Sequence, residues 1–354
     1  MMREIGSEFW AGCTPLNGSG VEPLMPAGMD VRYTLCGRTA LELVLRDLLQ
    51  QRPVHSAYLP SYCCHTMIEP FVAKDIKVEF YDVFFTEAGI DFCFDEDNRC
   101  DLIFLMDYFG FQNPKTALAA AGQKAKGKCV VYDATHAMFC RDMDYSSCDY
   151  VFGSFRKWFG VNAGFCAKAG AWNGFPMLAQ NSWYTEQRNA AFDRKRAFMA
   201  GESAEKMQFL QAFAGAEEHL ETDYLGYGPD RESMRILETV NLEFIFQKRR
   251  ENAAFAMDSI HALKSKYIGS PYKTVGEKEC PLFVPLQVDP SVRTALRGKL
   301  IENRVYLPIH WPLSQLHETG SVSQMIYDSE LSFVCDQRYA REDMERAAEI
   351  IRSF

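Results

Sequence analysis

The sequence predicts an α/β fold, in which a mostly parallel sheet is flanked by helices in three layers and a smaller α+β domain follows. Short, continuously apolar runs alternate with helical patterns over residues 34–170, which is typical of a parallel sheet buried on both faces. After residue 231 the pattern changes to a long helical segment followed by one strand and two helices. With 354 residues, 47% of them hydrophobic, the chain is long enough for two domains. We place them at 1–235, including an N-terminal arm, and 236–354.

Helices and strands of the first domain alternate along the chain. Apolar residues at helical spacing predict helices over 39–51 and 114–126, and a helix interrupted near Pro70 over 61–74. The apolar runs between them predict buried strands. These strands are expected at 54–60, 77–83, 101–110, 128–136 and 149–155.

The remaining segments link to the second domain and form it. Residues 170–230 are rich in aromatic and charged side chains without a clear period, so we predict irregular structure there. Residues 231–267 have a long helical pattern and are predicted as the spine between the domains. The second domain is expected to contain a strand within 281–288 and helices over 291–304 and 341–354.

Charge and cysteine content exclude several classes of protein. The net charge of −9 argues against a broad nucleic-acid-binding surface, and no window approaches a membrane span or a signal peptide. We therefore predict a cytoplasmic protein without nucleic-acid or membrane partners. The twelve cysteines contain no CxxC pair, which indicates reduced thiols. Cys63-Cys64-His65 is the one tight group of potential metal ligands, and because no second half follows, we predict no metal site.

Polar residues at the carboxyl ends of predicted strands mark the expected ligand site. Asp107, Asp133 and Ser154 have such positions. The carboxylate of Asp133 can hold a cation such as a protonated ring nitrogen, although a lone aspartate is more often a helix cap. Lys157 follows Ser154 by three residues, and burial beside Arg156 would favour its neutral, nucleophilic amine. A lone lysine, by contrast, is more often a surface side chain.

A third feature completes the pattern. A helix is expected to begin at Gly37-Arg38-Thr39-Ala40, and its free backbone N–H groups suit a phosphate. A carboxylate, a nucleophilic lysine and a phosphate cradle are together what pyridoxal phosphate requires.

At these residues the sequence resembles the fold-type-I pyridoxal-phosphate enzymes, specifically the DegT/DnrJ/EryC1/StrS aminotransferases. The resemblance spans nearly the whole chain and is weakest over 170–230. Five segments carry it: CGRTALELVL (36–45), YLPSYCCHTM (58–67), YDATHA (132–137), GSFRKWFGVNAGF (153–165) and LSFVCDQRYAREDMERAAEII (331–351).

The resemblance implies roles for individual residues around the cofactor, pyridoxal 5'-phosphate. It implies Asp133 on the pyridine nitrogen, with His136 in the place of the family's glutamine, and Lys157 as the lysine that binds the cofactor covalently. Trp158 and Phe159 are expected to exclude water from this amine. The phosphate is expected at Gly37, Arg38, Thr39 and Ser154.

The sequence departs from the family at two places. Ser154 precedes Lys157 by three residues instead of five, which is closer to a divergent subgroup with Ser-x-Arg-Lys. Cys64 stands where many relatives have the aromatic side chain that stacks on the cofactor ring, which leaves Tyr62 or His65 for that contact.

The expected reaction is transamination from an amino acid, with glutamate as donor, to a keto acceptor. In this family the acceptor is commonly a nucleotide-linked keto-sugar of aminosugar biosynthesis, and the active sites lie in a homodimer. The segment 306–313, with His310 and Trp311, is expected to form the substrate wall, and Arg188 and Arg231 to contact substrate anions. Two alternatives stay open: a sugar dehydratase or other lyase that uses the same cofactor, and a catalytically inactive binding or regulatory protein.

Overall fold

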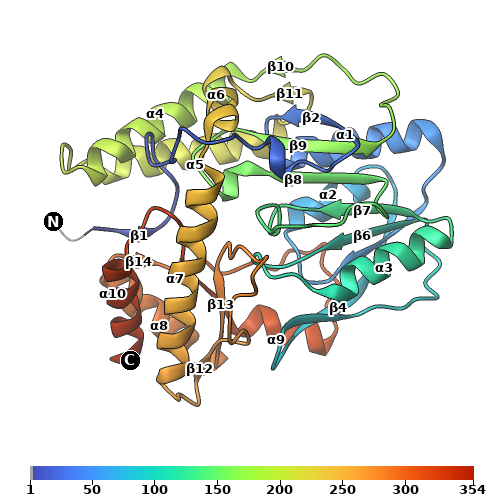
Figure 1. The fold of residues 1–354 in the computed structure, drawn as a ribbon. Helices are drawn as coiled ribbons and strands as arrows, with labels where there is room; N and C mark the ends of the chain where they lie inside the picture. The colour runs from blue at the N-terminus through green and yellow to red at the C-terminus, as the bar shows by residue number, and fades with distance from the viewer. Residues whose placement is uncertain (1–2) are drawn as a thin grey trace.

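The computed structural model describes residues 3–354 and contains a central sheet of eight strands (Figure 1). Five neighbouring strands, β8, β7, β6, β3 and β4, are parallel, and β2, β9 and β5 pair antiparallel at the two sides. The predicted mostly parallel α/β sheet is confirmed. In sheet order the strands are β2 (Met29–Thr34), β9 (Gly164–Ala169), β8 (Tyr150–Ser154), β7 (Cys129–Asp133), β6 (Leu102–Met106), β3 (Ser56–Pro60), β4 (Lys77–Thr86) and β5 (Gly89–Cys93).

Helices cover both faces of this sheet. α1 (Gly37–Gln51) and α2 (His65–Val72) contact each other on one face, and α3 (Pro114–Ala125) packs on β6 and β7 on the other (Figure 1). This arrangement follows from right-handed crossovers, because the chain moves along the sheet in opposite directions through α2 and through α3. The prediction over 61–74 was wrong in detail: the helix begins at His65, and Pro70 lies inside it.

Three strands of the sheet escaped prediction because charged residues interrupt their apolar runs. β2 carries Asp30 and Arg32, which form an ion pair at 3.0 Å. β9 carries Lys168, whose buried ammonium lies 2.8 Å from the carboxylate of Asp47. β5 forms a short hairpin with β4. The buried ion pair with Asp47 allows Lys168 inside β9, whereas Asp30 and Arg32 are partly exposed on β2 at the edge of the sheet.

The prediction of irregular structure over 170–230 was wrong. This segment contains a helical hairpin of α4 (Ser182–Met199) and α5 (Lys206–Thr222). Arg188 and Lys195 are buried on α4, so charged residues occupy positions of the stripe that would otherwise show the helical period. The short strands β10 (Ala179–Gln180) and β11 (Tyr227–Gly228) pair beside this hairpin.

The predicted spine over 231–267 consists of two helices instead of one. α6 (Arg231–Thr239) ends before Val240, and α7 (Leu242–Ala262) begins after Asn241. The side chain of Asn241 accepts a hydrogen bond from the backbone N–H of Phe244 at 3.0 Å, which caps α7. α7 runs between the central sheet and the C-terminal elements (Figure 1).

The C-terminal elements surround a three-stranded antiparallel sheet. The predicted strand and both predicted helices are present here, whereas α9 was not predicted. The sheet order is β12 (Ile268–Gly269), β13 (Val284–Val288) and β15 (Glu330–Phe333), and the helices are α8 (Pro290–Glu302), α9 (Ser321–Ser329) and α10 (Arg341–Arg352).

The N-terminal arm packs against these C-terminal elements. β1 (Ile5–Gly6) pairs in parallel with β14 (Val305–Tyr306), and Arg338 donates hydrogen bonds to the backbone oxygens of Glu8 (2.9 Å) and Ser7 (3.2 Å). The proposed boundary between residues 235 and 236 lies within α6 and stays a prediction. Among residues 3–354, no helix combines the length and the apolar character that a membrane crossing requires.

Candidate active site

One cavity of about 270 Å³ collects most of the predicted site residues. It lies where β7 and β8 end, beside the first turns of α1 and α2 and the last turns of α5. The predicted residues that line it are Gly37, Arg38, Cys64, Asp133, His136, Ser154, Lys157 and Trp311. Segments far apart in the sequence therefore meet at the carboxyl edge of the parallel strands, as expected for this sheet type.

The start of α1 provides an anion cradle. The first backbone N–H groups of a helix have no intrahelical partner, and the helix dipole is positive there. A Cβ atom on Gly37 would lie 3.2 Å from the Cβ of Ser154, so the glycine allows the helix to begin close to the end of β8. Thr39 does not line the cavity, and its hydroxyl donates to the backbone oxygen of Tyr224 at 2.7 Å. This arrangement fits a phosphate group.

Asp133 ends β7 and is buried. Its Oδ1 accepts a hydrogen bond from the backbone N–H of Thr135 at 2.8 Å. Burial raises the pKa of the Asp133 carboxyl to about 6, although the hydrogen bonds of Thr135 and the charge of Lys157 act in the opposite direction. A cationic ligand group beside this carboxyl would favour its ionised form.

Lys157 reaches the cavity from a 3₁₀ turn, Phe155–Lys157, directly after β8. Trp158 lies in the core, where its ring stacks on Phe139 at 4.3 Å and its indole N–H donates to the backbone oxygen of Thr135 at 2.7 Å. Neither Trp158 nor Phe159 lines the cavity, and Lys157 is exposed. The expectation that these aromatic residues exclude water was wrong: they anchor the turn that presents the lysine.

His136 and Trp311 form one wall. The backbone N–H of Phe109 donates to Nδ1 of His136 at 3.3 Å, so Nε2 carries the hydrogen of the neutral ring. Burial lowers the pKa of His136, as do the charges of His310 and Lys157. The ring of Trp311 lies 5.3 Å from that of His136 with an interplanar angle of 28°. The wall therefore offers one donor and one flat apolar face.

His310 and Tyr62 lie behind this wall and do not line the cavity. Nδ1 of His310 lies 2.8 Å from the hydroxyl of Ser332, and burial lowers the pKa of His310 to about 3. Tyr62 is buried with its ring 5.1 Å from that of Trp311. Tyr62 thus supports Trp311, and among the candidates for the ring contact, Cys64 and His65 reach the cavity.

The thiol of Cys64 has an unusual environment. Burial raises its pKa, but hydrogen bonds from His65 and Thr66 and the charge of Lys157 outweigh this effect, so the pKa lies below its usual value. The hydroxyl of Thr66 donates to Sγ at 3.2 Å. Cys64 therefore differs from the aromatic residue that it replaces not only in size but also in having a thiol with a lowered pKa.

The predicted substrate arginines lie outside the cavity lining. Arg188 is buried behind Glu217, to which it donates at 2.6 Å, and its second nitrogen lies 3.2 Å from the carboxylate of Glu8. Arg231 is exposed at the first residue of α6. Their contacts with substrate stay predictions. Arg156 does line the cavity, and it forms an ion pair with Glu217.

Sequence reasoning missed the contribution of α5, because the segment 170–230 was predicted as irregular. Glu217, Leu220 and Glu221 line the cavity, and Glu221 binds Arg38 at 3.1 Å. Acidic residues four apart beside a helical stripe (Phe209, Phe213, Ala216 and Leu220) were the available signal.

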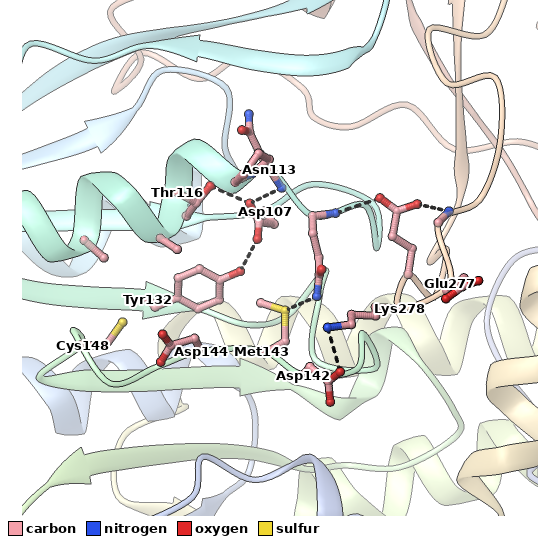
Figure 2. Close-up of a pocket in the computed structure, with 16 residues that line it drawn as sticks. Asp107, Asn113, Thr116, Tyr132, Asp142, Met143, Asp144, Cys148, Glu277 and Lys278 are labelled. Carbon is pink, nitrogen blue, oxygen red and sulfur yellow. Dashed lines mark hydrogen bonds and ion pairs between the residues drawn. The ribbon is translucent and has the colours of Figure 1, made fainter.

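Asp107, the other strand-end aspartate, lies in a different cavity of about 540 Å³ (Figure 2). Figure 2 shows its carboxylate between three donors: the hydroxyls of Thr116 (2.6 Å) and Tyr132 (2.9 Å) and the backbone N–H of Asn113 (3.2 Å). These bonds tie the end of β6 to α3 and β7. Asp107 therefore has a structural role at the larger of the two cavities.

Comparisons with known proteins agree with the fold. No family model matches the chain, and no curated protein matches its sequence. Among solved structures, the Helicobacter pylori aminotransferase PseC, involved in the biosynthesis of pseudoaminic acid, has a TM-score of 0.64 and 11% identity, covering 100% of this chain and 98% of its own.

Two further structures are similar. NtdA from Bacillus subtilis with bound cofactor PMP has a TM-score of 0.61 and 14% identity, covering 91% of this chain and 72% of its own. A DegT DnrJ EryC1 StrS aminotransferase from Brucella abortus has a TM-score of 0.59 and 14% identity, covering 92% and 86%. The chain therefore has the fold of these aminotransferases, as the sequence predicted.

Proposed function

We propose that the protein is a pyridoxal-phosphate-dependent aminotransferase that moves an amino group from an amino acid, with glutamate as donor, to the keto group of a nucleotide-linked sugar. The observation that carries this proposal is the cavity that brings Asp133, Lys157, Ser154 and the start of α1 together. When bound, pyridoxal phosphate supplies an aldehyde for the amine and a ring that accepts electrons from the donor's α-carbon.

Each residue has a definite task in this proposal. The carboxylate of Asp133 would hold the ring nitrogen protonated, an electrostatic role that burial strengthens. The amine of Lys157 would bind the cofactor and, once released, move a proton at the donor's α-carbon as general base and acid. The N–H groups of α1 and the hydroxyl of Ser154 would hold the phosphate. The N–H at Nε2 of His136 would donate a hydrogen bond to the cofactor.

The structural relatives support this proposal by what their names state. PseC is an aminotransferase of pseudoaminic acid biosynthesis, and NtdA holds the cofactor PMP. A sugar acceptor suits the flat face of Trp311, because apolar ring faces pack well on aromatic side chains. Neither a dehydratase nor an inactive binding protein is favoured by a specific contact in the cavity.

The assembly and location are part of the proposal. Lys157 is exposed in the single chain, whereas such chemistry works best where water is excluded, so we propose a homodimer in which the partner subunit covers the cavity. All twelve cysteines are free thiols, which supports a reducing compartment and hence a cytoplasmic location. Light scattering of the eluting protein would measure the oligomeric state.

The first test is covalent trapping. Wild-type protein, Lys157→Ala and the control Lys248→Ala are incubated with pyridoxal phosphate, reduced with borohydride and digested for mass spectrometry. We expect a pyridoxyl group on Lys157 in wild type and the control, and no site-specific label in Lys157→Ala. Labelling of other lysines alone would overturn the assignment.

Addition of L-glutamate then distinguishes the reactions. A transaminase converts its bound cofactor to the amine form and releases one equivalent of 2-oxoglutarate, which can be quantified directly. Cofactor binding without any conversion would favour a dehydratase or a non-catalytic protein.

A further inference from the structure

The α5 side of the candidate site is acidic, although the opposite side is built for anions. Glu217, Leu220 and Glu221 have the spacing that places side chains on one face of a helix, and all three line the cavity. Both glutamates pair with arginines of the cavity, Glu217 with Arg156 and Glu221 with Arg38. The two cations nearest to the start of α1 and to Lys157 are thus neutralised from within the chain.

The two glutamates differ in how firmly they are held. Glu217 bridges two arginines, because Arg188, which is buried, also donates to it at 2.6 Å. Moving Glu217 would leave a buried charge without a full partner, which is costly. Glu221 pairs only with Arg38 among the described residues, at 3.1 and 3.3 Å, and 49% of its side chain is exposed. Glu221 can therefore leave at small cost, whereas Glu217 cannot.

Arg38 remains in place when Glu221 moves. Its guanidinium lies over the ring of Tyr224 at 5.1 Å and donates to the backbone oxygen of Leu220 at 3.1 Å. Only 8% of its side chain is exposed. A fixed arginine beside the positive end of a helix is suited to bind a phosphate group.

Glu221 also lies close to a second carboxylate. One ligand atom each of His65, Glu69 and Glu221 lies within 4.8 Å of the others, and Nε2 of His65 pairs with Glu69 at 3.7 Å. The two carboxylates repel each other, and His65, whose pKa is raised by Cys64 and by both glutamates, offsets part of this repulsion.

We propose that Glu221 is a displaceable counter-ion: it neutralises Arg38 in the ligand-free protein, and a phosphate monoester must displace it in order to bind at the start of α1. This inference rests on the proposed function in that it uses the same cradle. The structure accordingly has a built-in competitor for its phosphate-bearing ligand, and the affinity for that ligand is set by a side chain of α5.

The test compares three proteins: wild type, Glu221→Gln, and the control Glu218→Gln. Glu218 is exposed on the same helix and does not line the cavity, and its substitution removes the same charge. Dissociation constants are measured by calorimetry for two probes, inorganic phosphate and pyridoxal 5'-phosphate. We expect Glu221→Gln to bind both roughly twofold to fivefold more tightly, the range for removing a partly exposed competing ion pair, and the control to match wild type.

A second background separates local competition from general charge effects. In Arg38→Gln the competitor has nothing to neutralise, so adding Glu221→Gln should change the phosphate affinity by less than about twofold. Equal or weaker binding by Glu221→Gln, an equal gain in Glu218→Gln, or no phosphate binding by any of the proteins would each overturn the inference. If the phosphate affinity rises as expected but pyridoxal phosphate does not bind, the counter-ion role stands and the proposed function fails.

Discussion

Asp107 and Asp133 lie at the ends of neighbouring strands of one sheet, yet the chain provides them with different sets of hydrogen-bond partners. Met106 pairs with Asp133 in the register of β6 and β7, so the two aspartates are one residue out of step. Both are buried, and burial raises the pKa of each to about 6. Asp107 accepts hydrogen bonds from two hydroxyls and a backbone N–H (Figure 2), whereas Asp133 accepts from Thr135 and lines the cavity that contains Lys157.

This difference shows how two carboxyl groups with the same burial and the same direction of pKa shift can have different roles. The chain itself provides three hydrogen-bond donors to Asp107, which offset part of the cost of burying its carboxylate. Asp133 faces a space where a cationic ligand group can provide the offset. A perturbed pKa therefore indicates a functional residue only where the chain itself does not provide the partner of the charged group.

The largest effect should appear in a matched pair of variants. Asp133→Asn is expected to slow the half-reaction with glutamate by about 100-fold or more, because the ring nitrogen loses its charged partner. Asp107→Asn should stay within about threefold of wild type. The measurement is the rate at which the cofactor's absorbance changes after glutamate is added. Similar losses in both variants would erase the functional distinction between the two aspartates.

Stability without cofactor should show the reverse order. Asp107→Ala leaves the hydroxyls of Thr116 and Tyr132 and the N–H of Asn113 without their acceptor, so we expect a loss of about 3 kcal/mol in the free energy of unfolding. Asp133→Ala removes a buried carboxyl with few internal partners and should lie within about 1 kcal/mol of wild type. Urea denaturation of the cofactor-free proteins measures both values, and a larger loss for Asp133→Ala would contradict the comparison.

The pH dependence of stability sharpens the comparison further. An acid whose pKa is higher in the folded than in the unfolded state binds its proton more tightly when folded, so it destabilises the fold as the pH rises from about 4 to about 6. As the pH rises across this window, the free energy of unfolding of Asp107→Asn and of Asp133→Asn should each increase by on the order of 2 kcal/mol relative to that of wild type. Pyridoxal phosphate should abolish the gain for Asp133→Asn alone, because it gives that carboxylate a cationic partner. Urea titrations at several pH values, with and without cofactor, test this.

The smallest effect concerns one donor of Asp107. Tyr132→Phe removes a single hydrogen bond to its carboxylate, at 2.9 Å, and should cost about 1 kcal/mol of stability. The half-reaction with glutamate should be unchanged. Thermal unfolding and the glutamate assay, carried out on the same preparation, would show whether the two cavities are energetically independent.

Much of the large sheet was predictable because its central strands are continuously apolar and end in polar residues. β9 was not, since Lys168 has its partner inside the fold, and β2 was not, since the partly exposed residues Asp30 and Arg32 interrupt its apolar run. The helix α4 was missed for a related reason: Arg188 and Lys195 are buried at positions where the helical period requires apolar residues, whereas α5 has an apolar stripe that was overlooked. Buried charged side chains such as Lys168, Arg188 and Lys195 hide the apolar pattern on which sequence prediction depends.

The candidate site was predictable as far as it lies at strand ends and at the start of α1. Asp133, Ser154 and Lys157 have sequence positions that indicate their chemistry. Glu221 and Arg38 lie 183 positions apart, and no local pattern indicates that they pair. Similarly, Arg188 has the charge expected of a residue that binds a substrate anion, but it forms ion pairs with Glu217 and Glu8. Tertiary pairing decides which charges remain available to a ligand.

The N-terminal arm has a consequence for the order of folding during synthesis. Glu8 is held by Lys195, which is fully buried, and by Arg338, which lies 330 positions later. A ribosome releases residues 3–169 long before residue 338 exists, so the central sheet can form while the arm still lacks its contacts with β14 and Arg338. Closing so long a loop has an entropy cost, which arises only when the arm binds the C-terminal residues at the end of synthesis. The arm therefore docks last, and its docking joins the early and the late parts of the chain into one cooperative unit.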